Sequence, residues 1–361
     1  MSPVGEQKQR DAALSDALRK VAPGTQLREG IDLILSAQAG ALIVIGDYEQ
    51  VEKICNGGFD ISAEFTANRL AELAKMDGAI IIDENVKKIL KFNVHLVPDP
   101  SLPTSETGTR HRTAERVSLQ TNALVIAISE SRRLVSIYVG GQKHILEDIS
   151  TLLSRANQAL QTLERYRNRF DQVSASLSSL EFQELATLSD VVTVIQRAEM
   201  LERVAAEVDR YVVQLGSEGR LIRMQEDELI SGVSDEYLMI IRDYVISKRK
   251  PESVKRDISQ LTPEGLLDPL KIARTLGYDS DPTVLDEIVS PRGFRLLKKI
   301  PRLPLSVASN LVVKFKDLRG ILRASVEELD DVEGVGEVRA RAIFEGLRRL
   351  KEASVGERAF L

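Results

Sequence analysis

The stretch Leu73-Ala-Lys-Met-Asp-Gly-Ala-Ile-Ile-Ile82 joins the end of a helical pattern to an apolar run through an Asp-Gly turn. Asp-Gly is a frequent helix stop, and a short apolar run after such a turn favours a buried strand. The same alternation occurs upstream, where helical spacing over Leu27 to Ala37 is followed by Gly40 and the β-rich run Ala41-Leu-Ile-Val-Ile45. Repeated transitions of this kind predict an α/β domain at the beginning of the chain.

The same domain should contain two more strands, a second helix and a long loop. Leu124 to Ile128 and Leu134 to Val139 are predicted strands joined by a charged turn, and residues 62–76 have the apolar spacing of a helix. The stretch between Ile82 and Leu124 holds three prolines and is longer than an ordinary connection, which is typical of loops that carry function. We expect four strands in a central mixed sheet flanked by helices, over residues 1–148.

The rest of the chain is expected to be all α. Apolar residues recur at steps of three and four from Leu153 to Leu180, which predicts a long amphipathic helix. Further helical segments are predicted over residues 195–213 and 226–245. Residues 263–291 contain several prolines and are interpreted as breaks rather than a new core. We therefore expect a helical linker or spine over residues 149–289 and a separate domain over residues 290–361.

Composition excludes several classes of protein. The 361 residues carry a net charge of -5 and are 43% hydrophobic, so a wholly disordered chain is excluded. One cysteine and three histidines cannot build a disulfide framework or a zinc finger, so a catalytic metal should use oxygen ligands. The longest apolar runs are far shorter than the roughly 20 residues that span a bilayer. We expect a cytoplasmic protein that does not bind membranes.

Charge is unevenly distributed, and the basic end carries a glycine turn. Residues 290–361 have a net charge of +5, against -10 for residues 1–289. Here Val332-Glu-Gly-Val-Gly-Glu-Val-Arg-Ala-Arg-Ala-Ile343 places two glycines, Gly334 and Gly336, between helical runs, just before Arg339 and Arg341. A glycine turn admits a phosphate to the backbone, and the amides that open the second helix can donate to it. The stretch resembles the helix-hairpin-helix motif of DNA repair proteins.

A poorer copy of this motif precedes it. In Ile300-Pro-Arg-Leu-Pro-Leu-Ser-Val-Ala-Ser-Asn-Leu311, Arg302 and Pro304 occupy the positions that the motif usually gives to glycine. This copy either contacts DNA or is structural only. Paired copies in proteins of this kind grip the sugar-phosphate backbone without reading bases, which implies sequence-independent and salt-dependent binding.

The first domain carries two further motifs, Asp77-Gly78-Ala79 and Gly108-Thr-Arg-His-Arg-Thr113. Each is ordinary alone, as a helix stop and as a solvated charge cluster. Together they offer a carboxylate for Mg²⁺, a glycine that admits a ligand to the backbone, and several donors for phosphate oxygens. This combination suits phosphoryl or nucleotidyl transfer.

With Arg110-His111-Arg112 at this separation from Asp77-Gly78-Ala79, the domain resembles the diadenylate cyclase domain. The order of domains resembles the bacterial DNA integrity scanning (DisA) family over the full chain. The resemblance implies that two ATP condense to cyclic di-AMP with release of two pyrophosphates, dependent on Mg²⁺ or Mn²⁺. It also implies a homo-octamer in which facing cyclase domains each offer half of a composite site. Branched double-stranded DNA, bound without sequence specificity by the C-terminal domain, would lower cyclase output in DNA damage signalling, near the nucleoid.

The resemblance also assigns roles to residues. Asp77 would bind the metal and help to activate a ribose 3′-hydroxyl, which makes it the catalytic residue. The residues expected to bind ATP are Gly78, Ala79, Leu96, Thr109, Arg110, His111, Arg112, Thr113 and Ser129. Those expected to bind DNA are Gly334, Gly336, Arg339 and Arg341. His95 and His144 have no motif role and are expected to be structural.

Two other functions are compatible with the residues. A DNA-binding scaffold could sense ATP or cyclic di-AMP without making it, although intact Asp77, Arg110 and Arg112 argue against this. A structure-specific nuclease or a helicase is disfavoured, because the chain has no Gly-x-x-x-x-Gly-Lys-[Ser/Thr] loop and no recognisable carboxylate cluster.

Overall fold

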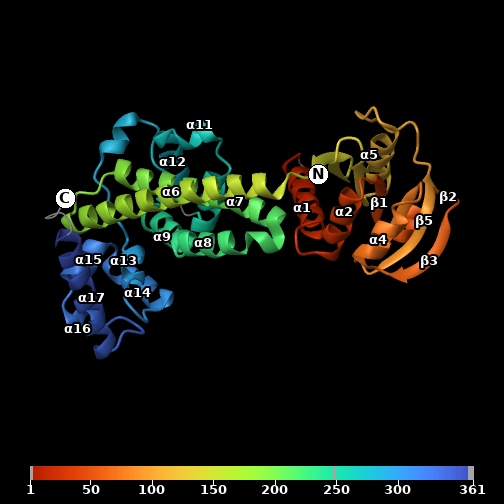
Figure 1. Ribbon diagram of the computed structural model, residues 1–361. Coiled ribbons are helices and arrows are strands. Elements are labelled where there is room, and N and C mark those ends of the chain that lie inside the picture. Colours follow the sequence, from red (N-terminus) through yellow and green to blue (C-terminus); the bar gives the residue numbers. More distant parts are fainter. Residues whose placement is uncertain (1–2, 247–248, 357–361) are drawn as a thin grey trace. The chain divides into compact units, whose positions relative to one another are not determined.

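The computed structural model describes residues 3–246 and 249–356 (Figure 1). Two compact units are present. One comprises residues 1–158 with 208–224, and the other comprises residues 159–207 with 225–361. The long helices α6 (Ile149–Gln183) and α7 (Leu188–Leu215) contribute residues to both units.

The first unit contains an eight-stranded mixed sheet. Seven strands follow the order β2-β5-β4-β1-β6-β7-β8, and β3 pairs with β5 outside this path. β1 and β4 are parallel, whereas the other pairs are antiparallel. The strands are β1 (Ala41–Gly46), β2 (Cys55–Asn56), β3 (Phe59–Glu64), β4 (Ala79–Asp83), β5 (Lys88–Leu96), β6 (Leu124–Ser129), β7 (Leu134–Val139) and β8 (Gln142–Ile145). The mixed sheet confirms the expected fold class.

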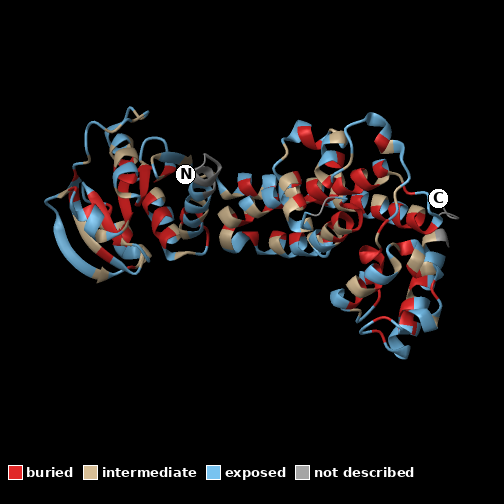
Figure 2. Cartoon of the chain, turned by 180° about the vertical axis from the view of Figure 1, so that it is seen from behind, coloured by how far each residue is buried: buried red, intermediate tan, exposed pale blue. Residues whose placement is uncertain are grey.

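Helices cover both faces of the sheet. Alternate residues of β1 enter different cores: Ile43 packs with α1 (Pro3–Lys20), α2 (Gln26–Ser36) and α4 (Ala67–Leu73), whereas Val44 packs with α3 (Tyr48–Glu52) and α5 (Thr109–Thr121). Burial on two faces explains why these strands are continuously apolar in sequence. Figure 2 shows the central strands buried and the outer strand β3 exposed.

Four strands were predicted, and β1, β4, β6 and β7 confirm them. The other four were missed because they lie at or next to the outer strands of the sheet and are very short, as β2 is, or mix charged and polar with apolar residues, as the exposed strand β3 does. The helix predicted over residues 62–76 is wrong at its start, since β3 ends at Glu64 and α4 begins after Thr66, whose side chain caps it. The predicted long loop after Ile82 contains β5 and α5.

The second unit is helical, as expected. α6 confirms the predicted long helix, and α7 confirms the next one. The segment predicted as one helix over residues 226–245 is two helices, α8 (Arg220–Ile230) and α9 (Val233–Tyr244), because Gly232 adopts a left-handed φ of 73° between them. η1 (Gly216–Gly219) precedes α8.

The proline-rich segment is more ordered than predicted. Residues 251–286 form α10 (Pro251–Ser259), α11 (Pro263–Leu266), α12 (Pro269–Leu276) and the 3-10 helix η2 (Pro282–Asp286). Prolines lie in the first turn of each of these helices, where they need no amide hydrogen bond. Ile272 and Leu276 are fully buried, so the interpretation of residues 263–291 as breaks without a core is wrong.

Five helices end the described chain. They are α13 (Phe294–Lys298), α14 (Leu305–Phe315), α15 (Leu318–Arg323), α16 (Val326–Asp330) and α17 (Glu337–Gly356). Their shared core includes Leu311, Leu329 and Ile343, and it also takes in Phe182 of α6 and Met239 of α9. These helices are therefore packed directly on α6 and α9.

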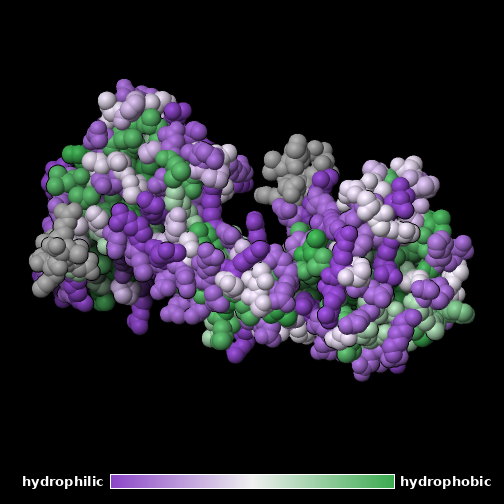
Figure 3. Space-filling view, turned by 45° about the horizontal axis from the view of Figure 1, so that its top comes forward, coloured by the Kyte–Doolittle hydropathy of each residue, from purple (hydrophilic) through white to green (hydrophobic). Residues whose placement is uncertain are grey.

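The surface in Figure 3 is mainly hydrophilic, and its hydrophobic groups form separate patches. Among residues 3–246 and 249–356, no helix combines the length and the apolar character that crossing a membrane requires.

Candidate functional site

Asp77 and Gly78 lie at the side of the sheet that is formed by the ends of its strands, which is called the edge from here on. They immediately precede β4, which runs parallel to β1 with Ala79 opposite Leu42. The first residues of both strands therefore meet at the same edge. Asp77 and Gly78 are exposed there, whereas the side chain of Ala79 is fully buried and supports the strand from within.

β5 and β6 bring their last residues to this edge. β5 is antiparallel to β4, with Val94 opposite the first residue of β4, so Leu96 lies beyond that strand's start. β6 is antiparallel to β1, with Ile128 opposite the first residue of β1, so Ser129 lies at the same edge. Leu96 is 6% exposed and Ser129 is half-buried. The topology thus gathers motif residues that are about fifty positions apart in the sequence.

Gly78 is required by the backbone. Its φ is 95°, and an added Cβ would lie 2.7 Å from the carbonyl carbon of Asn93 and 2.9 Å from the amide nitrogen of Val94. Only glycine tolerates both the left-handed conformation and this approach to β5. The turn that presents Asp77 is consequently held in one place by the β4–β5 pairing.

The second motif opens α5. Thr109, Arg110 and Arg112 are exposed on its first turn, and His111 and Thr113 are half-buried. The N-cap is Gly108, which provides no side-chain cap, so the first amides are available to a ligand. A helix N-terminus with two exposed arginines is suited to phosphate.

Arg110 ties α5 to the sheet edge. Its Nη1 donates to the carbonyl oxygen of Ile128 at 3.1 Å, near the end of β6. The same guanidinium packs on Gly40, just before β1, where an added Cβ would lie 2.2 Å from Nη1. Gly40 therefore positions Arg110, a role that no sequence motif marks.

We expect Gly40→Ala to weaken ATP binding about tenfold without lowering the free energy of unfolding. The new methyl group displaces the flexible end of Arg110, and a hydrogen bond to a charged group contributes about 1.5–3 kcal/mol. Nucleotide titration and urea unfolding measure the two effects. Arg110→Ala should cost a similar factor, and the double variant should be no weaker than Arg110→Ala alone. Additive losses would contradict this account.

His111 is the third motif residue with a defined contact. Its Nδ1 lies 2.9 Å from the hydroxyl of Tyr138, a fully buried residue of β7. Burial lowers the pKa of His111, while the carboxylate of Glu106 opposes that shift. The motif predicts a role for His111, whereas Tyr138 and Glu106 lie outside any motif and could not be singled out from the sequence.

The remaining histidines lie elsewhere on the sheet. His95 is on β5 opposite Asn56 of β2, and His144 is on β8 opposite Ile137. Neither contacts Asp77 or the α5 motif among the contacts of the described residues. Ser129 accepts a hydrogen bond from the amide of Arg132 at 3.4 Å, which shapes the β6–β7 turn.

The donor set at Asp77 bears on the expected metal. No cluster of three His, Cys, Asp or Glu side chains suited to a metal occurs within the described ranges. Asp77 offers one exposed carboxylate. Mg²⁺ is commonly held by one or two carboxylates together with substrate phosphates and water. Asp77 therefore fits a metal that binds with the nucleotide.

The C-terminal helices form two hairpins with matching geometry. α13 and α14 flank one turn and α16 and α17 flank the other, at a constant offset of 32 residues. Gly334 has a φ of 84°, and Arg302, its counterpart in the first turn, has a φ of 60°. The first hairpin thus keeps the left-handed turn although glycine is absent.

Both turns face one hollow. It has a volume of about 490 Å³. The residues that line it are Pro301, Arg302, Gly336, Glu337, Val338, Arg339 and Ala342. Gly334 and Arg341 are not in the lining: Gly334 accepts from the Arg339 guanidinium, and Arg341 pairs with Glu337 at 2.7 Å.

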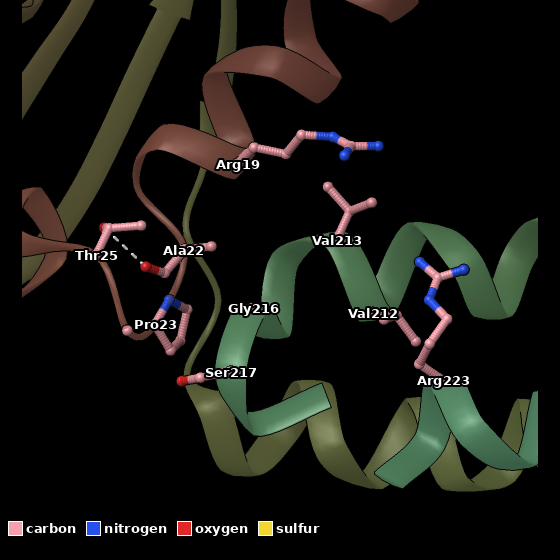
Figure 4. A pocket seen from close by; sticks show the side chains of 10 residues that line it. Arg19, Ala22, Pro23, Thr25, Val212, Val213, Gly216, Ser217 and Arg223 are labelled. Atoms are coloured by element: carbon pink, nitrogen blue, oxygen red, sulfur yellow. Dashed lines mark hydrogen bonds between the residues drawn. The ribbon is translucent and has the colours of Figure 1, made fainter. Parts of the chain in front are cut away.

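A different hollow, of about 350 Å³, lies between the α1–α2 turn and the end of α7 in the first unit (Figure 4). Thr25 closes one side by donating to the carbonyl of Ala22 at 2.9 Å. Arg19 and Arg223 extend into the open space between the helices, and Arg223 pairs with Asp209 at 2.5 Å. None of the residues that the sequence singled out lines this hollow.

The fold and the site are those of a class of protein in which a nucleotide-binding cyclase domain is joined to a DNA-binding hairpin domain. Residues 28–143 match the family described as DisA bacterial checkpoint controller nucleotide-binding, residues 146–285 match the DisA bacterial checkpoint controller linker region, and residues 317–346 match the helix-hairpin-helix motif. The chain is a diadenylate cyclase, a nucleotidyltransferase, with a helix-hairpin-helix domain. It belongs to the DisA family of DNA integrity scanning proteins.

Similarity to curated relatives extends over nearly the whole chain. The DNA integrity scanning protein DisA of Carboxydothermus hydrogenoformans is 52% identical over 95% of this chain and 98% of its own length. The corresponding protein of Acetivibrio thermocellus is 50% identical over 97% of each chain. That of Acidothermus cellulolyticus is 51% identical over 96% of each chain.

Proposed function

We propose that this protein condenses two ATP into cyclic di-AMP and two pyrophosphates at a site shared by two facing subunits, and that branched DNA on its hairpins lowers the output. One observation carries the proposal: Asp77 and the α5 motif are gathered at one exposed sheet edge. Such an exposed edge offers phosphate donors and a carboxylate.

The residues divide the chemistry between them. Each ribose 3′-hydroxyl gives up its proton to solvent, helped by Asp77, and attacks the α-phosphorus of the other ATP as its bond to pyrophosphate breaks and pyrophosphate leaves. Asp77 would hold Mg²⁺ or Mn²⁺, whose contribution is to neutralise phosphate charge. Arg110, His111 and Arg112 hold triphosphate oxygens, and Thr109 and Thr113 add hydroxyl donors. Gly78 and Leu96 pack against adenosine, with Ser129 near a phosphate or the ribose.

A shared site has a geometric consequence. Each cyclase domain binds one ATP at its edge. The 3′-hydroxyl of one ATP can attack the α-phosphorus of the other in line only if the edges of two domains face each other. We infer a homo-oligomer, an octamer by resemblance, whose assembly is required for turnover. Specific activity should fall when the protein is diluted below the range in which it assembles, with sedimentation followed in parallel. Constant activity per subunit in a monomeric sample would exclude the shared site.

The hairpins would bind the sugar-phosphate backbone. Exposed amides at the start of α17 and the nearby Arg302 and Arg339 suit phosphates and do not read bases. Branched double-stranded DNA without sequence preference is therefore the proposed ligand, which implies nucleoid association and a role in DNA damage signalling. DNA binding would act on the cyclase by changing how the edges of two subunits face each other. A displacement of about 1 Å between the two ATP molecules would lower the rate of cyclisation by orders of magnitude.

We expect the first hairpin to contribute to this binding through Arg302. Arg302→Gln should reduce the slope of log affinity against log salt by about 1 and weaken binding to every sequence similarly. Salt titrations with a four-way junction measure this. Arg274→Gln on α12 removes an exposed arginine outside the hairpins and serves as the control. Equal slopes for both variants would make the first hairpin structural only.

A sensor that binds ATP or cyclic di-AMP without synthesis is the alternative from a different class. It predicts nucleotide binding with no release of pyrophosphate from ATP in Mg²⁺ or Mn²⁺. The gathered Asp77 and α5 motif favour synthesis, because binding alone would need no carboxylate beside the triphosphate donors.

A further inference from the structure

His111 ends a chain of polar contacts that runs through the cyclase domain. Its Nδ1 is 2.9 Å from the Tyr138 hydroxyl, which is 3.0 Å from Oε1 of Glu106. The same carboxylate oxygen is 2.7 Å from Nζ of Lys143 on β8. The four side chains come from α5, β7, the loop before α5 and β8, so no local sequence pattern requires them to meet.

The directions of these hydrogen bonds can be assigned by chemistry. An ionised carboxylate only accepts, so Tyr138 donates its single proton to Glu106. Burial raises the pKa of the Tyr138 hydroxyl, and the hydrogen bond to Glu106 raises it further, so the phenol stays protonated. Its oxygen must then accept from His111, which places a proton on Nδ1 and leaves Nε2, on the other side of the ring, for a ligand.

We propose that Tyr138 and Glu106 are positioning residues of the cyclase site: they keep one proton on Nδ1 of His111, so that Nε2 takes up a proton from solvent and donates a hydrogen bond to a triphosphate oxygen when ATP binds. The inference rests on the proposed phosphate-binding role of His111. It adds what that role did not include, a fixed tautomer and a second layer of residues that sets it. Partners of this kind typically change affinity or activity about 10- to 100-fold.

The charged groups around His111 shift its pKa in opposite directions, so removing them one at a time tests the proposal. Burial lowers the pKa of His111, Glu106 raises it, and Lys143, Arg110 and Arg132 lower it. Because the protonated ring is the form that binds phosphate, affinity should fall as pH rises through the pKa of the free protein. That fall therefore begins below the ordinary histidine pKa of about 6.5.

The experiment measures binding of 3′-deoxy-ATP, which cannot react, to the full-length protein with Mg²⁺ between pH 5 and 8. Glu106→Gln removes the charge that raises the pKa of His111, so the fall in affinity should move to lower pH by about 1 unit. Lys143→Met removes a charge that lowers it, so the fall should move to higher pH. The nucleotide's own titration is common to all variants and cancels in the comparison.

Tyr138→Phe should weaken binding about tenfold at pH 6. Tyr237→Phe is the matched control, because Tyr237 is equally buried and donates to Glu199 at 3.3 Å, but lies in the helical unit. It should leave nucleotide affinity unchanged.

Shifts in opposite directions for Glu106→Gln and Lys143→Met support the proposal. A uniform loss of affinity at every pH, or shifts of the same sign, would overturn it and leave a structural contact. If His111→Gln binds 3′-deoxy-ATP as tightly as the unmodified protein does, the phosphate-binding role of His111 itself fails, which is a separate outcome.

Discussion

Asp77→Asn is expected to lower the rate of cyclic di-AMP formation about 1000-fold, equivalent to about 4 kcal/mol of transition-state stabilisation. The amide has the shape of the carboxylate but neither the charge that holds a divalent metal nor the basicity that helps a 3′-hydroxyl to react. Asp77 is exposed in its turn, so folding should be unaffected. Product formation at saturating ATP, followed by mass spectrometry, measures the loss.

Asp60→Asn provides the matched control for this prediction. Asp60 is an exposed aspartate of the same domain, on β3, where it pairs with Lys91 at 3.3 Å. Its replacement should leave turnover within a factor of two of the unmodified protein. DNA affinity should be unchanged in both variants, because the hairpins belong to the other unit. If Asp77→Asn retained a tenth of the activity, another group would have to hold the metal.

Arg295→Met is expected to lower the free energy of unfolding of the helical unit by about 3–5 kcal/mol. Arg295 is buried on α13, where its guanidinium pairs with Glu181 and lies 3.2 Å from Glu236. Its removal leaves carboxylates without their counter-ion in the interior. Urea unfolding followed by far-ultraviolet circular dichroism measures the loss.

Substitution of a surface arginine of the same unit is the control that separates the effect of losing a charge from the effect of losing a buried charge. Arg319 on α15 is half exposed and pairs with Glu184 at 3.2 Å. Arg319→Met should cost less than about 1 kcal/mol, as exposed ion pairs do. Combining Arg295→Met with Glu181→Gln should recover part of the stability, because one unpaired charge is removed as well. A loss below about 1 kcal/mol for Arg295→Met alone would show that the buried cluster does not hold α13 in place.

Apolar patterning predicted the parts of the fold that are buried on two sides. β1 and β4 are continuous apolar runs because helices cover both faces of the sheet there, and α6 keeps a regular apolar stripe over its length. β3 escaped prediction because nearly all of its residues are exposed, and β5 because charged and polar residues alternate irregularly with its apolar ones. Periodicity measures burial, so edge strands and short capped helices give a weak signal.

The candidate site was predictable only where a motif marked it. Asp77 and Arg110 lie in motifs, and the parallel pairing of β1 with β4 explains why the two motifs come to the same edge of the sheet. Gly40, Glu106 and Tyr138 do not, since their roles depend on contacts with residues that lie between 27 and 70 positions away in the chain. Arg302 stands where the motif usually has glycine, yet its backbone adopts the same left-handed turn as Gly334.

The most direct test of the account is the identity of the product that the full-length protein forms from ATP and Mg²⁺ or Mn²⁺, measured by mass together with released pyrophosphate, with and without a saturating four-way DNA junction. We predict cyclic di-AMP, two pyrophosphates for each molecule formed, and a slower rate when the junction is bound. Nucleotide binding without any cyclic dinucleotide or pyrophosphate, under either metal, would contradict the cyclase.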